Sequence, residues 1–204
     1  MLITRIVHSL LLLALAACTA GAAESAEPVS HQPSTETKPT ETKPIEDLPN
    51  FHQVHDYLYR GGQPSAAGLE KLKQRGISTI IDLRNPGEKK FDEDRLAQKL
   101  GMKIIDMPMD CTAPTKKQVS TLYTAVDKAK EGKSGPVFVH CAHGSDRTGC
   151  LIGLWRVSKE GWSYDDAYKE MRKYYFTPKF VHLSEAVRSA ANKGAPQDSS
   201  EARQ

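Results

Sequence analysis

Residues 137–149, VFVHCAHGSDRTG, constrain this chain more than any other segment. The segment begins as an apolar run typical of a buried strand, and from Thr148 onward the sequence has the composition of a buried helix. Between the two stand a thiol, Cys141, a glycine, Gly144, and an arginine, Arg147. A strand that turns directly into a helix directs the first backbone N–H groups of the helix at one place, which favours an anion there. The segment therefore predicts a strand–loop–helix unit that cradles a phosphate.

The side chains of this loop suit the attack of a thiolate on a phosphate ester. The helix N-terminus and Arg147 would both stabilise Cys141 as a thiolate. Gly144 allows the loop to curl, the arginine fork can hold two phosphate oxygens, and the Thr148 hydroxyl can donate a hydrogen bond to the departing thiolate. The residues expected to surround the phosphate are Ala142, His143, Gly144, Ser145, Asp146 and Thr148.

Apolar runs and helical periods alternate after residue 50. Short apolar runs predict buried strands at 78–83, 103–107 and 136–140. Apolar residues at helical spacing predict helices at 65–75, 92–100, 115–131, 147–160, 164–174 and 178–191. This alternation indicates an α/β sandwich with a mainly parallel central sheet flanked by helices.

The run His140-Cys141-x5-Arg147-Thr148-Gly149 resembles the signature of the cysteine-dependent protein tyrosine and dual-specificity phosphatases. Three further segments resemble small bacterial members of that family, including periplasmic ones: residues 59–65, 80–84 and 162–171. The resemblance covers residues 54–190. It implies a dual-specificity-phosphatase-like fold, a phosphocysteine intermediate on Cys141, and catalysis without a metal or another cofactor.

The reaction also needs an acid for the leaving oxygen and then a base for water. In the family that the loop resembles, this group is an aspartate on a loop after the strand that precedes the long helix. Asp110 occupies that place and is the predicted general acid and base. Two alternatives stay open. Asp106 lies at the end of the strand, and Asp146 stands beside the arginine, where some lipid phosphatases of the superfamily carry an Asp-Arg-Thr sequence.

The amino terminus has the pattern of an export signal. A leucine-rich run at 10–15 is too short to span a bilayer but has the length of a secretory apolar region. The sequence Leu15-Ala16-Ala17-Cys18 resembles the lipobox of bacterial lipoproteins. This implies a signal peptide at 1–17, lipidation of Cys18 and, with Thr19 next, periplasmic anchoring to the outer membrane. Cleavage at 20–22 would instead release a soluble periplasmic protein.

The rest of the chain divides by composition. Residues 18–49 are rich in Thr, Glu and Pro, repeat TETKP in tandem, and read as a disordered tether. Residues 50–192 are the predicted catalytic domain, expected to be monomeric, and 193–204 a flexible tail. From residue 50 onward, 25 Lys and Arg face 19 Asp and Glu, an excess that serves solubility or attracts anions. The basic residues are scattered without an aromatic platform, which argues against a nucleic-acid reader.

The remaining reactive side chains have more ordinary interpretations. His140 is expected to orient the loop, and it lacks the second ligand cluster that a metal site needs. Asp82 and Arg84 are expected to pin neighbouring loops. Cys150 reads as a small buried helix residue, whereas Cys111, beside the predicted acid, could form a disulfide in an oxidising compartment.

The predicted function is hydrolysis of phosphate monoesters in extracytoplasmic proteins. Phosphotyrosine is the favoured ester, because this loop carries His143 and Asp146 where members acting on inositol phosphates often place lysines. The alternatives are an inositol-phosphate or phosphoinositide phosphatase of the same superfamily, and a phosphate-binding module without turnover. A sulfurtransferase of the rhodanese type is disfavoured, since those loops are shorter and lack the Arg-Thr-Gly ending.

Overall fold

The computed structural model describes residues 47–89 and 91–194. The predicted signal peptide, the lipidation of Cys18, nearly all of the tether and the end of the tail lie outside the described residues. No helix in the described part of the chain combines the length and the apolar character needed to cross a membrane.

The centre of the fold is a five-stranded sheet with the order β1-β2-β5-β3-β4. The strands are β1 (His52–His55), β2 (Leu58–Gly61), β3 (Thr79–Asp82), β4 (Lys103–Asp106) and β5 (Val137–His140). β1 and β2 pair antiparallel, and every other pairing is parallel, which confirms the predicted sheet. Because β5 lies between β2 and β3, the loop that follows it is flanked by the segments after both of these neighbours.

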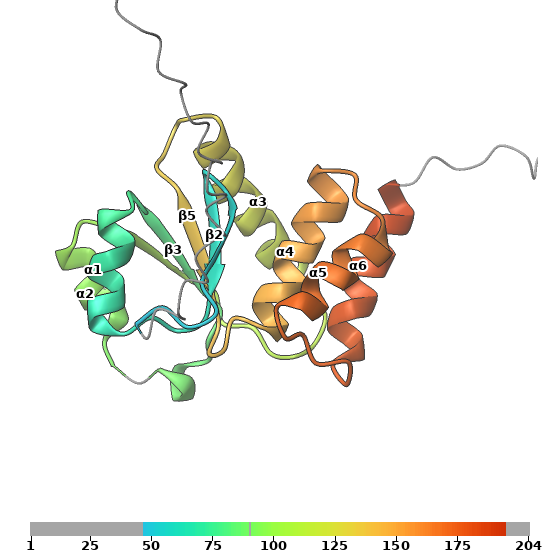
Figure 1. The fold of residues 1–204 in the computed structure, drawn as a ribbon, viewed down its shortest axis with the longest axis horizontal. Helices are drawn as coiled ribbons and strands as arrows, with labels where there is room; N and C mark the ends of the chain where they lie inside the picture. The colour runs from blue at the N-terminus through green and yellow to red at the C-terminus, as the bar shows by residue number, and fades with distance from the viewer. Residues whose placement is uncertain (1–46, 90, 195–204) are drawn as a thin grey trace, which may run out of the picture. The chain divides into compact units, whose positions relative to one another are not determined.

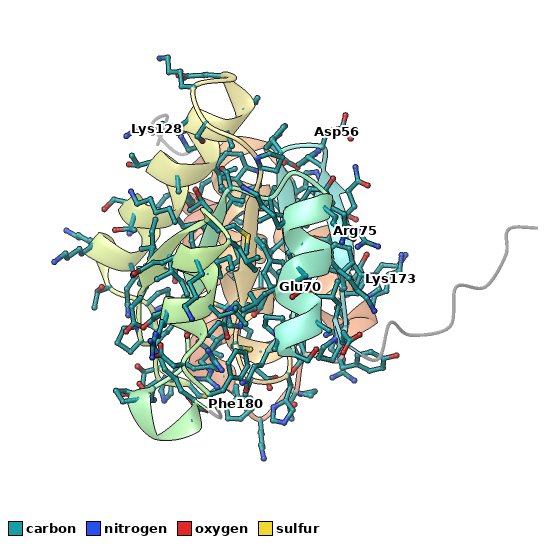
Figure 2. All side chains as sticks on the ribbon, turned by 90° about the vertical axis from the view of Figure 1, so that its left-hand side faces the viewer. Asp56, Glu70, Arg75, Lys128, Lys173 and Phe180 are labelled. Carbon is teal, nitrogen blue, oxygen red and sulfur yellow. The ribbon has the colours of Figure 1, made fainter. Side chains whose placement is uncertain are left out.

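Helices cover both faces of the sheet (Figure 1). On one side lie α1 (Ala66–Gln74) and α2 (Glu93–Lys99). On the other lie α3 (Lys116–Lys130), α4 (Asp146–Lys159), α5 (Tyr164–Lys173) and α6 (Val181–Gly194), and a short 3-10 helix, η1 (Pro86–Glu88), follows β3. Charged side chains such as Glu70 and Lys128 project from the outside of this sandwich (Figure 2).

Two apolar cores form because side chains alternate across a strand. On β5, Val137 and Val139 belong to the core under α3–α6, whereas Phe138 belongs to the core under α1 and α2. All three are fully buried. This burial on both faces explains why the central strands read as continuous apolar runs in the sequence.

The structure confirms each predicted strand and helix, with shifts at their ends. It adds the hairpin of β1 and β2, which the sequence did not predict because β1 is partly exposed and has no regular apolar alternation. The packed body also begins before the predicted boundary at residue 50: Leu48 is fully buried in the core with α1. At the other end, α6 continues to Gly194, past the predicted end of the domain at 192.

Candidate active site

Backbone geometry fixes the curl of the loop after β5. Gly144 has φ +74°, and a Cβ on it would lie 2.3 Å from the backbone carbon of Gly61. A side chain at this position is therefore excluded both by conformation and by space. The end of β2 supports the loop on this side, since Gln63 N–H donates to the carbonyl of Ala142 at 3.1 Å. The predicted curl of the loop at Gly144 is present.

Cys141 lies at the start of this curl. Its side chain is nearly buried, and the N–H of Gly144 donates to Sγ at 3.2 Å. A backbone donor at this distance stabilises a thiolate more than a thiol, because the hydrogen bond strengthens with negative charge on the acceptor. The start of α4 at Asp146 adds the positive end of a helix to the same place.

Arg147 is fixed by one end of its guanidinium. Nη1 and Nη2 donate to the two carboxylate oxygens of Glu88 at 2.6 and 2.7 Å. Nη1 also donates to the carbonyls of Leu83 and Met109, both at 3.2 Å. This leaves the side edge, Nε and the second proton of Nη2, free of hydrogen bonds to the described residues. That edge is the second fork of a guanidinium and can hold two oxygens of a phosphate.

Glu88 and Arg147 reinforce each other's charge. The hydrogen bond from Arg147 lowers the pKa of Glu88, and the same bond raises the pKa of Arg147. Glu88 ends η1, directly after β3, and Asn85 N–H donates to its carboxylate at 2.7 Å. Glu88 was not among the site residues predicted from the sequence. The sequence feature that could have indicated Glu88 is its place shortly after a predicted parallel strand, because the loop lies at the same edge of the sheet.

The three candidate acids differ in their surroundings. Asp110 is exposed, and only Oδ1 is engaged, as the acceptor of a 2.8 Å hydrogen bond from Nδ2 of Asn85. Asp106 ends β4 and pairs with Lys89 at 3.0 Å. Asp146 accepts from Thr177 N–H at 2.7 Å with Oδ1 and from the hydroxyl of Ser145 at 3.1 Å with Oδ2.

The loop of Asp110 is tied to the phosphate-binding arginine, because the carbonyl of Met109 just before it accepts from Arg147. Asp110 and Asp106 each retain one oxygen without a partner among the described residues, whereas both oxygens of Asp146 are engaged. This arrangement favours Asp110 as a proton donor and gives Asp146 a structural part, between the loop and the turn that follows α5.

The other predicted loop residues are in place around the curl. The carbonyl of His143 accepts from Asn50 Nδ2 at 3.3 Å. Ser145 is nearly buried, and Thr148 is fully buried. The Thr148 hydroxyl has no hydrogen-bond partner among the residues that the structure describes. It is available to a departing thiolate, and that role stays a prediction.

A buried charge network braces the loop from below. Arg84 donates to both carboxylate oxygens of Asp82, at 2.8 and 2.7 Å, and to Glu93 at 2.6 Å. His140 places Nε2 3.0 Å from the other oxygen of Glu93 and Nδ1 3.3 Å from the carbonyl of Cys141. Burial acts to raise the pKa of Asp82, but hydrogen bonds from Arg84 and the nearby His140 outweigh it, so the pKa is lowered. These contacts agree with the expected bracing roles.

The same network contains the candidate metal ligands of the described residues, which are Asp82, Glu93 and His140. The guanidinium of Arg84 already occupies three of the four carboxylate positions there. A cation would have to displace it, so this donor set does not fit a metal ion. Glu93 was not predicted from the sequence; its side chain reaches the network from the first turn of α2.

A groove of about 720 Å³ opens beside the loop. Its lining is largely apolar, with Pro64, Phe91 and Ala142, and its polar members include Gln63 and Glu88. The groove shares Ala142 and His143 with the loop, and Glu88 with the contact of Arg147.

Known proteins resemble the chain over this same region. TpbA of Pseudomonas aeruginosa, described as a dual specificity protein phosphatase, is 25% identical over 125 residues, 61% of this chain and 54% of TpbA. Inositol diphosphatase DSP5 of Arabidopsis thaliana is 27% identical over 129 residues, 61% of each chain. The chain thus spans little more than half the length of these curated relatives. The crystal structure of P. aeruginosa TpbA shares the fold, with a TM-score of 0.59 at 21% identity over 72% of this chain and 91% of that one.

Residues 40–189 match the family described as DSP-PTPase phosphatase fused to NAD+ kinase. The match takes in the sheet, the loop after β5 and the helices that support it. It confirms the resemblance seen in the loop residues. The chain therefore belongs to the cysteine-dependent, dual-specificity type of protein tyrosine phosphatase.

Proposed function

We propose that the protein hydrolyses phosphate monoesters, with Cys141 as nucleophile, Arg147 as the phosphate-binding residue and Asp110 as general acid and base. The observation that carries the proposal is the arrangement of the loop. Gly144 N–H points at Sγ of Cys141, while Glu88 holds Arg147 so that its side edge stays free for two phosphate oxygens.

The reaction proceeds in two displacements. In the first, Sγ of Cys141 attacks phosphorus, the P–O bond to the alcohol breaks as the S–P bond forms, and Asp110 gives its proton to the leaving oxygen. In the second, water attacks phosphorus and gives a proton to the Asp110 carboxylate. The S–P bond breaks and inorganic phosphate leaves. The Thr148 hydroxyl donates to the sulfur as it departs, and Arg147 with the loop N–H groups holds the phosphoryl oxygens throughout.

Phosphotyrosine is the ester that this site fits best. The groove beside the loop offers an aromatic ring, Phe91, and the flat apolar surface of Pro64 to a phenol. TpbA, the relative named as a dual specificity phosphatase, has been crystallised with pTyr. Phosphoserine and phosphothreonine are weaker candidates, because their shorter side chains would leave less of the groove filled.

A second candidate is an inositol phosphate or phosphoinositide, supported by the plant relative named as an inositol diphosphatase. The charges near the loop disfavour it. Glu88 accepts from Arg147, Asp110 follows Met109, whose carbonyl also accepts from Arg147, and Asp146 precedes that arginine in the chain. Several further phosphates would meet these carboxylates. The structure therefore supports one phosphate dianion at a time.

The cellular setting belongs to the same proposal. A lipid anchor at Cys18 would hold a monomeric catalytic domain at the periplasmic face of the outer membrane, within reach of phosphorylated extracytoplasmic proteins. Labelling with radioactive palmitate tests this. Label that disappears in a Cys18→Ser chain supports the anchor, and an unlabelled wild-type chain in the soluble periplasmic fraction argues for release.

The activity is tested with the full chain in EDTA and a thiol reductant. The substrates are p-nitrophenyl phosphate, a phosphotyrosine peptide, a phosphoserine peptide and inositol hexakisphosphate. We expect turnover of the first two, complete loss in Cys141→Ser and strong loss in Asp110→Asn. Absence of turnover by the wild-type chain on all four would overturn the proposal, and preference for the inositol compound would move the assignment to the second candidate.

A further inference from the structure

Arg60, on β2, is a buried cation behind the loop. Its side chain is fully excluded from solvent. Nη2 donates to the carbonyl of Gly144 at 2.7 Å, and the guanidinium lies over the ring of Tyr174 with 4.5 Å to the centroid. Nε and Nη1 are buried and have no partner among the described residues. The structure thus encloses a charged group with much of its hydrogen-bonding capacity unused.

No carboxylate of the described residues forms an ion pair with this arginine, although Arg84, Arg147 and Arg156 each pair with one or two. Burial lowers the pKa of Arg60 to about 10, so the side chain remains charged at neutral pH. The groups that favour its charged form include Glu170, Tyr174 and Cys141. A buried charge without a carboxylate partner is costly unless another negative charge is close.

Gly144 stands between this cation and the nucleophile. Its carbonyl accepts from Arg60, and its N–H donates to Sγ of Cys141 at 3.2 Å. Because glycine has no Cβ, the peptide groups on its two sides could take other orientations unless contacts fix them. The hydrogen bond from Arg60 is such a contact.

We propose that Arg60 is a positioning residue for the phosphatase reaction: it holds Gly144 so that its N–H faces Cys141, and its unpaired charge stabilises the thiolate from behind. This inference rests on the proposed function. Arg147 binds the phosphate from the front, whereas Arg60 touches no substrate atom. Its negative partner is supplied by the reaction itself, as the thiolate before attack and as the loop-bound phosphoryl group afterwards.

The size of the effect follows from the contacts. Two hydrogen bonds and the backbone of one residue join the guanidinium to Sγ, which places the charge on the order of 8 Å from the sulfur. At an effective dielectric constant of about 20, a unit charge at that distance changes the thiolate-to-thiol ratio by more than about tenfold.

The experiment measures the thiolate directly in the full chain. Iodoacetamide alkylates Cys141, and mass spectrometry of its peptide gives the rate at pH 5.5 relative to pH 9.5, because the thiolate is the reacting form. The variants are Arg60→Gln, which keeps a donor and loses the charge, and Arg60→Lys, which keeps the charge. Arg188→Gln is the control, since Arg188 is also stacked on a ring, that of Tyr164, and its carboxylate partner, Glu185, lies on the same helix, α6.

We expect the rate ratio to fall about tenfold in Arg60→Gln and to stay within twofold of wild type in Arg60→Lys and Arg188→Gln. For p-nitrophenyl phosphate, kcat should fall in both Arg60 variants, more in Arg60→Gln. A folded Arg60→Gln chain with the wild-type ratio would overturn the proposal. Should Arg60→Gln not fold, a tenfold fall in Arg60→Lys would overturn it as well, since the charge is kept there. Alkylation needs no turnover, so a failure of the proposed phosphatase activity would be seen separately.

Discussion

The contact between Glu88 and Arg147 leads to a quantitative prediction for Glu88→Gln. The glutamate accepts from both ends of the arginine fork, at 2.6 and 2.7 Å. A glutamine of the same shape keeps one acceptor and turns an N–H donor toward a guanidinium N–H. One hydrogen bond is lost, the other loses its charge assistance, and Arg147 becomes free to rotate its side edge away from the phosphate.

Two opposing effects set the outcome. A hydrogen bond between charged groups contributes about 1.5–3 kcal/mol, and the Glu88 side chain is 35% exposed, so screening reduces this to about 1–2 kcal/mol. Against it, removal of a negative charge near a phosphate dianion relieves a repulsion of similar size. The repulsion acts on bound substrate and transition state alike, whereas alignment of the arginine counts most in the transition state. We therefore expect kcat to fall about tenfold, with less than about a threefold change in competitive inhibition by inorganic phosphate.

Steady-state kinetics with p-nitrophenyl phosphate test this, with Glu131→Gln as the matched control. Glu131 also pairs with a basic side chain, Lys133, at 2.6 Å, but on the exposed turn before β5. The pKa of Glu88 lies below its ordinary value of 4.5, so the ion pair is complete above that pH and is lost as the pH falls through the lowered pKa. The difference between variant and wild type should be constant from about pH 5 to 8. An unchanged or higher kcat in Glu88→Gln would refute the positioning role.

Three further substitutions separate the parts of the site. Asp110→Asn should lower kcat about 100- to 1,000-fold, whereas Asp146→Asn should mainly lower the thermal midpoint; the reverse result would transfer the acid role. Gly144→Ala should abolish turnover, because its Cβ would lie 2.3 Å from backbone at φ +74°, and activity within tenfold of wild type would contradict the loop geometry. Gly68→Ala places a Cβ 2.1 Å from the Asp47 carbonyl oxygen. It should lower the free energy of unfolding by about 2–3 kcal/mol in urea titrations, and an unchanged value would mean that the segment before residue 50 does not pack on α1.

The parts of the fold that the sequence predicted are those with local signals. β5 and α4 are buried on all sides and read as continuous apolar runs, and α3 shows a helical period after the capping box of Thr115 and Gln118. β1 lacks such a signal. Its side chains are half exposed, and its place in the sheet depends on pairing with β2 rather than on its own pattern.

The candidate site shows the same division. Cys141, Gly144 and Arg147 stand in one loop, so their spacing alone indicated their chemistry. Glu88 and Arg60 lie 59 and 84 residues from their partners in the loop and carry no motif of their own. Their roles follow from the parallel sheet, which brings the ends of β2 and β3 to either side of the end of β5. Such contacts can be predicted only when the order of the strands in the sheet is known, because no single segment of the sequence indicates them.

The charges around the loop argue for a substrate with a single phosphate. The positive charge of Arg84 is paired with Asp82 and Glu93, and that of Arg147 with Glu88. The electrostatic attraction that either arginine exerts on a distant anion is therefore reduced. Among the arginines described next to the loop, Arg60 is left without a carboxylate, and it donates to the carbonyl of Gly144. The attraction for phosphate then comes mainly from short-range donors: the loop N–H groups, the start of α4 and the free edge of Arg147. Donors of this kind bind one phosphoryl group tightly and offer little to a second one several ångströms away, where carboxylates already stand.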